Sequence, residues 1–158
     1  MIGNMMNKAS GYYLYNNPAI TMGAIVAMLN SEREIELARI TLFLPILLDD
    51  NIVAKINKTE YSFENIVALN RLYISNFNER YRDILPLFIN ALSILLDMDI
   101  IILRGEFAQR TNSEFCSSLL ENSNSARLQA ISIASTRLLK VTRNIDLSKM
   151  YYRLNIEL

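Results

Sequence analysis

Apolar residues recur every three or four positions through most of the chain, a spacing typical of helices that bury one face. The longest such stretch begins at Ser62, which suits an N-cap, with Glu64 in the first turn, where the helix dipole favours an anion. It continues to Leu95, which is too far for one ordinary globular helix. Because proline fits a first turn but disrupts a helix interior, Asp83 and Pro86 predict a break into two helices.

The N-terminal region contains a well-marked helix start. Asn17 can accept a hydrogen bond from the first turn and Pro18 fits the first helical position, so a helix is predicted from Pro18 to about Leu29. Gly23 costs this helix about 1 kcal/mol relative to alanine, and we interpret it as a point where another element approaches closely. Residues 1–11 are predicted to form a loose arm.

The next segment is the most apolar of the chain. Ser31 and Glu34 have the spacing of a capping box and predict a second helix. The positions from Ile35 to Leu48 are apolar on most sides, so this helix is predicted to be buried centrally. Pro45 either kinks it or begins a fresh turn.

The hydrophobic period changes after the long helical stretch. Ile100–Leu103 is a continuous run rich in β-branched residues, Gly105 supplies a turn, and residues 106–109 alternate, which predicts a β-hairpin. Helix, strand, turn and strand follow one another as at the end of a winged helix, or as in a small hairpin lying on helices. Three further helices are predicted behind capping side chains: residues 113–121 after Asn112, 126–142 after Ser125, and 147–154 after Asp146. We therefore predict a mainly α fold, a compact helical domain over residues 1–158 with a small, winged-helix-like β-hairpin.

The length and composition fit one domain that has some apolar surface in addition to its core. The chain has 158 residues, of which 51% are hydrophobic and 20% are charged. This is enough to fill a core and to leave some apolar surface for a partner. The 16 basic and 16 acidic residues cancel, so the whole chain has no electrostatic reason to bind nucleic acid or an anionic membrane.

The side-chain inventory argues against catalysis and metal binding. The sequence has no histidine, which removes the commonest general base and a common zinc ligand. Cys116 is the only cysteine, so no intramolecular disulfide forms, as suits a reducing cytosol. Asp49 and Asp50 could bind a cation, but no third ligand is near in sequence, and we interpret them as a helix end that caps residues 51–56. We expect no enzyme activity and no cofactor.

Two apolar segments bear on localisation. Residues 19–29 and 84–96 are both shorter than the roughly 20 residues that a membrane-spanning helix needs. The N-terminus lacks a basic region followed by an apolar core, so it does not read as a secretory signal. The expected location is the cytoplasm, without a membrane partner.

The charge balance is broken near the C-terminus. Residues 126–153 contain six basic residues and one acid, a local excess of five positive charges. Arg137, Lys140 and Arg143 are three to four positions apart and share a helix face, and Arg127 precedes them. One interpretation is a solvated helix face whose charges offset acids elsewhere. The other is a contact for a nucleic-acid backbone or an acidic partner.

Three short motifs resemble those of a known family, the middle components of ABC-three-component systems. Tyr15–Ala19 resembles their Asn-Pro-Ala opening, Phe43–Leu48 their Leu-Pro signature in a buried helix, and Tyr152–Ile156 their closing aromatic-x-Leu-x-Ile/Val. Size and order agree across nearly the whole chain. It departs from the family pattern at Asp49-Asp50, where a more basic or His-containing end is expected, and at Asn155, where glycine is usual.

The resemblance implies a small, non-catalytic subunit encoded beside an SMC/Rad50-like ABC ATPase and often an effector such as a nuclease. Systems of this kind, Lamassu among them, act in bacterial defence against phages and plasmids. The middle component would bind the ATPase near its heads and couple DNA sensing to effector release. Its expected partners are therefore the ATPase subunit, the effector and, through the complex, DNA.

Two other functions compete with this one. A winged-helix DNA-binding transcriptional regulator would use the basic C-terminal helix to contact duplex DNA. An enzyme acting through Ser/Lys or carboxylates is disfavoured, because no nucleophile with its base and orienting group is discernible.

Overall fold

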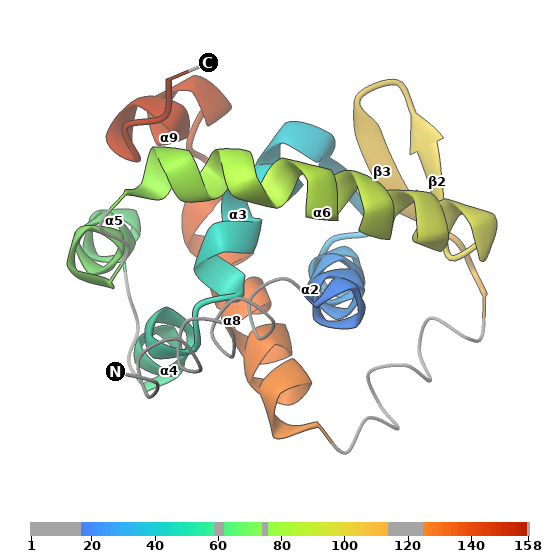
Figure 1. Cartoon of the computed structure of the whole chain (residues 1–158), viewed down its shortest axis with the longest axis horizontal. Helices are drawn as coiled ribbons and strands as arrows, with labels where there is room; N and C mark the ends of the chain where they lie inside the picture. Colours follow the sequence, from blue (N-terminus) through green and yellow to red (C-terminus); the bar gives the residue numbers. More distant parts are fainter. Residues whose placement is uncertain (1–16, 59–61, 74–75, 114–124, 158) are drawn as a thin grey trace, which may run out of the picture.

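The computed structural model describes residues 17–58, 62–73, 76–113 and 125–157. These residues form seven helices and three short strands (Figure 1). The helices are α2 (Pro18–Ser31), α3 (Leu37–Leu47), α4 (Asp50–Lys58), α5 (Phe63–Tyr73), α6 (Phe77–Asp97), α8 (Ala126–Thr142) and α9 (Leu147–Arg153). The strands are β1 (Glu34–Glu36), β2 (Ile101–Arg104) and β3 (Phe107–Arg110). Three features of the prediction lie outside these ranges: the arm over residues 1–11, Cys116, and the helix over 113–121 except for its first residue.

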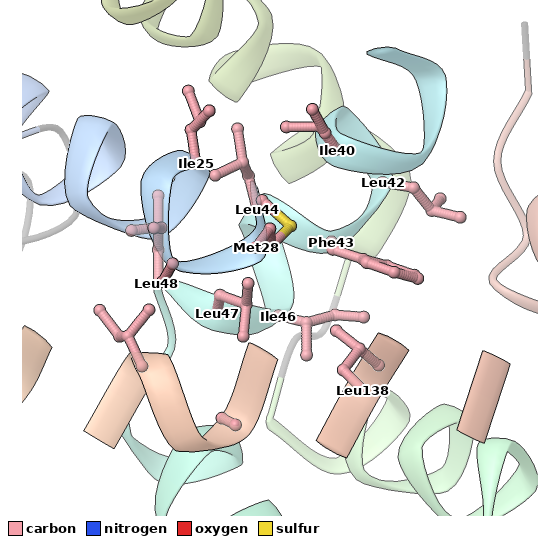
Figure 2. Packing of buried hydrophobic residues seen from close by; sticks show 14 of the residues in the cluster. Ile25, Met28, Ile40, Leu42, Phe43, Leu44, Ile46, Leu47, Leu48 and Leu138 are labelled. Atoms are coloured by element: carbon pink, nitrogen blue, oxygen red, sulfur yellow. The ribbon is translucent and has the colours of Figure 1, made fainter. Parts of the chain in front are cut away.

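The core is built around α3, as its nearly continuous apolar sequence predicts. Every residue from Ile40 to Leu47 is buried, and Phe43 is fully enclosed. Figure 2 shows side chains of α3 meeting Ile25 and Met28 of α2, with Leu138 of α8 close by. Fully burying one such side chain contributes about 1.5–3 kcal/mol, so α3 supplies much of the hydrophobic driving force. Pro45 lies inside α3, near its end.

Most of the predicted helix caps are confirmed. Asn17, Ser62 and Ser125 each accept a hydrogen bond from a first-turn amide, at 2.9, 3.3 and 3.3 Å respectively. Asp49 accepts two, at 3.0 and 3.1 Å, which confirms it as the cap of α4. Asp146 stands at the N-cap position of α9 but makes no such bond.

The predicted capping box at Ser31 and Glu34 is wrong. Glu34–Glu36 forms a strand instead, and α3 begins only at Leu37. In this strand Ile35 lies opposite Ala108 of β3, and both are buried. Pairing with a segment more than 70 positions away therefore overrides the local helix signal.

The predicted helix break at Asp83 and Pro86 is also wrong. Helix α6 runs unbroken through Pro86, and the division lies before Asn76, whose Oδ1 accepts a hydrogen bond from the amide of Glu79 at 3.3 Å. A proline leaves the carbonyl four residues earlier without its amide. Here that residue, Arg82, is exposed together with Pro86, so water can solvate the freed carbonyl.

The predicted hairpin is confirmed and gains a third strand. The antiparallel sheet has the order β1-β3-β2, and Gly105 at the hairpin turn has a φ of +59°, which favours glycine. The order of these elements is winged-helix-like. Elements α2, β1 and α3 are followed by α6, β2 and β3, and the first strand lies beside the last. Helices α4 and α5 lie between the two halves of this succession. Within the described ranges, no helix combines the length and apolarity needed to cross a bilayer.

Candidate partner-binding site

Two of the predicted contact residues on α8 hold the fold together. Arg127 pairs with Asp50 (Nε to Oδ1, 2.9 Å) and donates to the carbonyl of Leu48 at 3.2 Å. Arg137 donates to the carbonyl of Ile56 at 2.8 Å. Both guanidinium groups thus fasten α8 to the region of α4, and both are only partly exposed. Much of the local positive charge has a structural role.

The other two predicted contact residues lie at the surface. Arg143 pairs with Glu32 (Nη2 to Oε1, 3.3 Å), yet its side chain is 70% exposed. Lys140 is exposed one helical turn earlier. A role for these side chains in contacting DNA or a partner stays a prediction.

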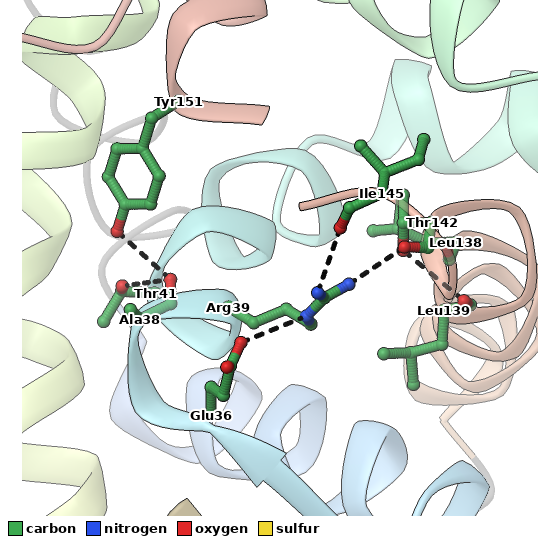
Figure 3. A network of polar contacts seen from close by, with 9 residues as sticks. All are labelled: Glu36, Ala38, Arg39, Thr41, Leu138, Leu139, Thr142, Ile145 and Tyr151. Atoms are coloured by element: carbon green, nitrogen blue, oxygen red, sulfur yellow. Dashed lines mark hydrogen bonds and ion pairs between the residues drawn. The ribbon is translucent and has the colours of Figure 1, made fainter. Parts of the chain in front are cut away.

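A polar network anchors the C-terminal segment on α3 (Figure 3). Arg39 donates to the carbonyls of Thr142 and Ile145, at 3.0 and 3.3 Å, and lies 3.6 Å from a carboxylate oxygen of Glu36. The two carbonyls end α8 and begin the link to α9, where a helix has no internal donors to offer. The position of α9 is therefore fixed by a side chain of the central helix.

Tyr151 makes a second set of contacts that hold α9 in place. Its hydroxyl donates to the carbonyl of Ala38 at 3.3 Å and lies 3.0 Å from the hydroxyl of Tyr81 on α6. The two rings meet edge to face, with centroids 5.9 Å apart. Burial, followed by the hydrogen bond with Tyr81, raises the pKa of Tyr151 well above its usual range. The hydroxyl stays neutral and keeps α9 packed between α3 and α6.

A pocket of about 480 Å³ opens where α9 ends. It lies between α5, the start of α6 and the residues that follow α9, and we call it the α5–α9 pocket. Its lining comprises Val67, Asn70, Arg71, Asn76, Phe77, Asn78, Tyr152, Arg153, Leu154 and Asn155. The volume is that of a small ligand site or of a cleft for one or two partner side chains.

The pocket is electropositive. Arg71 and Arg153 both line it and are exposed, and its lining includes no acid among the residues that the structure describes. Its wall also includes the first residues of α6, a helix of 21 residues whose dipole places partial positive charge at this end. The nearest carboxylate on α6 belongs to Glu79, and it accepts a hydrogen bond from Asn76 at 2.8 Å. The site thus favours a negatively charged group.

Asn70 gives the pocket wall an unmet acceptor. The residue is 2% exposed, and its Nδ2 donates to the carbonyl of Ile66 at 3.0 Å. Its Oδ1 has no hydrogen-bond partner among the described residues. An unsatisfied buried polar atom costs about 1–3 kcal/mol, so this acceptor lowers the stability of the fold.

Exposed apolar side chains lie at this end of the molecule. Tyr152 lines the pocket yet is 83% exposed, and Leu72, beside the pocket residue Arg71, is 78% exposed. Tyrosine and arginine are enriched among residues that dominate binding energies in protein interfaces. The combination indicates a protein-binding surface.

A family model described as ABC-three component (ABC-3C) system Middle Component 3 matches residues 7–158. The chain belongs to this family. The match confirms the resemblance read from the three motifs, while the link to Lamassu-type systems stays a prediction. In the same comparisons, no curated protein and no solved structure matched the chain.

The two departures noted in the sequence resemblance have structural explanations. Asn155, where the resemblance leads us to expect glycine, has a φ of +56°, a left-handed conformation that asparagine tolerates better than most residues. There the chain turns back, and the amide of Glu157 donates to Oδ1 of Asn78 at 3.1 Å. At the other departure, Asp49 caps α4 and Asp50 pairs with Arg127.

Sequence reasoning did not identify the pocket of this Middle Component 3 chain. Arg153 entered the prediction only as one of six basic residues, and Tyr152 only as part of the closing motif. Asn70 and Arg71 lie in an ordinary amphipathic helix, and no local signal distinguishes them. Only the packing of α9 against α5 and α6 brings these side chains together.

Proposed function

We propose that this chain is a non-catalytic accessory subunit of an SMC/Rad50-like ABC ATPase complex in bacterial defence against phages and plasmids. In this role it bridges the ATPase and an effector nuclease, as in Lamassu-type systems. Membership of a middle-component family supports the proposal, because a component of a three-part system has partner subunits.

The observation that carries the bridging role is the presence of two separate exposed apolar surfaces. One is the α5–α9 pocket with Tyr152 and Leu72. The other, which we call the α6–β2 corner, comprises Met98, Ile102 and Leu103, each about 40% exposed. They lie at opposite ends of α6 (Figure 1). With a rise of 1.5 Å per residue, α6 separates them by roughly 30 Å, enough for two partners at once.

The proposed lack of catalysis rests on the same surfaces. In the part of the chain that the structure describes, the pocket lining offers amides, guanidinium groups and one phenol, but no carboxylate, thiol or imidazole. A general base or nucleophile of the usual kinds would have to come from elsewhere. Binding is the function that these side chains serve best.

Co-expression with the neighbouring ATPase and effector genes tests the proposal. We expect the tagged chain to retain both subunits through affinity purification and size-exclusion chromatography. The paired substitutions Ile102→Glu and Leu103→Glu at the α6–β2 corner should release one partner and keep the other. Ile133→Glu, at an exposed apolar position of α8, is the matched control and should release neither. A chain that elutes alone from such cells would refute the proposal.

The winged-helix-like connectivity favours a second candidate, a DNA-binding regulator. In helix-turn-helix proteins the recognition helix enters the major groove, and Lys and Arg side chains neutralise phosphates. The corresponding helix here is α6, whose basic residues, Arg80 and Arg82, both lie in its first two turns, while residues 83–103 contain three aspartates and no basic residue. At the end of α8, the exposed Lys140 and Arg143 are the predicted DNA contacts to test. Salt-dependent binding of the purified chain to duplex DNA, lost in the Lys140→Glu, Arg143→Glu variant, would favour this candidate.

A further inference from the structure

We propose that the α5–α9 pocket binds an acidic peptide segment of a partner subunit, one that presents an Asp or Glu carboxylate. The inference rests on the proposed accessory function and assigns one of its two docking surfaces.

The positive charge of the pocket favours a carboxylate on the ligand. Arg71 and Arg153 reach the pocket from two different helices, and the amino end of α6 forms the wall beside them. Among the described lining residues none is acidic, and the Glu79 carboxylate beside them accepts a hydrogen bond from Asn76. A carboxylate that enters meets two guanidinium groups, which bind carboxylates with paired N–H donors, and a helix end that favours anions.

The apolar side chains and the pocket size select a peptide over nucleic acid. Tyr152 stands almost fully exposed beside the two arginines and offers an apolar ring to the flanking partner residues. A cavity of about 480 Å³ holds side chains, not a duplex. Duplex binding draws on a row of cations along an extended surface, and here there are two around one cleft.

Charge reversal in the co-purified complex tests the inference. The Arg71→Glu, Arg153→Glu variant should bind the partner subunit at least about tenfold more weakly than the wild-type chain. The matched control is Lys55→Glu, Lys58→Glu, which reverses two exposed charges of α4 and should change the Kd less than about twofold. All four positions are exposed, and thermal unfolding followed by circular dichroism checks that both variants fold.

Photo-cross-linking identifies the occupant. With p-benzoylphenylalanine in place of Tyr152, irradiation of the complex followed by mass spectrometry should locate a partner segment that contains Asp or Glu. A cross-link to a segment without a carboxylate, or to DNA, would overturn the inference. So would a pocket variant that binds the partner as tightly as the α4 control, and in that case the accessory function would stand. If the wild-type chain retains no partner at all, the accessory function itself fails.

Discussion

The contact between Gly23 and Leu128 allows a quantitative test of how α2 and α8 pack. A Cβ placed on Gly23 would overlap Cδ2 of Leu128, so the glycine lets the two helices approach closely, as the sequence suggests. Gly23→Ala gains about 1 kcal/mol of helix propensity. It also forces an extra carbon into a packed contact, which costs about 1–3 kcal/mol. We expect a net destabilisation of about 1 kcal/mol.

The second arm of the test removes the obstruction. In a Leu128→Ala background the three atoms nearest to the new methyl group are gone, so Gly23→Ala should now stabilise the chain by about 1 kcal/mol. The sign of the effect reverses, and the coupling free energy between the two positions is about 2 kcal/mol. Leu128→Ala alone should cost less than the 2–5 kcal/mol of a fully buried leucine, because Leu128 is only partly buried.

Urea denaturation of the four chains, followed by circular dichroism, measures this cycle. Asn90→Ala, at an exposed position of α6, is the control second site and should add to Leu128→Ala without coupling. If Gly23→Ala has the same effect with and without Leu128, the close-approach argument is refuted.

Three further predictions concern single side chains. Arg137→Met should lower the free energy of unfolding by about 1–2 kcal/mol in urea titrations, because it removes the bond to the carbonyl of Ile56. Asn70→Leu should raise it by about 1 kcal/mol, since an unpartnered acceptor disappears. Between pH 9 and 11 the wild-type chain should lose stability faster than Tyr151→Phe, as measured by the urea midpoint at each pH. The pKa of Tyr151 is raised in the native state, so only the unfolded chain releases this proton above a pH of about 10.

Local signals in the sequence were sufficient for several helix starts and their caps. A cap depends on one side chain and the amides two or three residues ahead, so Asn17 and Ser125 could be read directly. Strand β1 could not, because its three residues become a strand only against β3, far along the chain. The helix break predicted at Pro86 failed for a related reason. Whether a helix tolerates proline depends on whether the freed carbonyl reaches water, which the local sequence does not show.

Counting charges along the sequence does not show which basic residues face a partner. The excess of positive charge near the C-terminus can be counted in the sequence, but packing decides which way each basic side chain points. Arg127 and Arg137 turn inward to α4, whereas Arg153 turns to the α5–α9 pocket. Separating these roles needs the fold, because neighbouring positions of one helix look alike in sequence.

The packing of α2 against α8 has a consequence for synthesis on the ribosome. Helix α2 is complete at Ser31, yet Thr136, which contacts it from α8, comes 105 residues later. At about 5–20 residues per second, a nascent chain leaves the α8-facing side of α2 uncovered for roughly 5–20 seconds. The chain spends that interval as a substrate for chaperones and proteases, and a transcript truncated before α8 yields a product that cannot cover this side of α2.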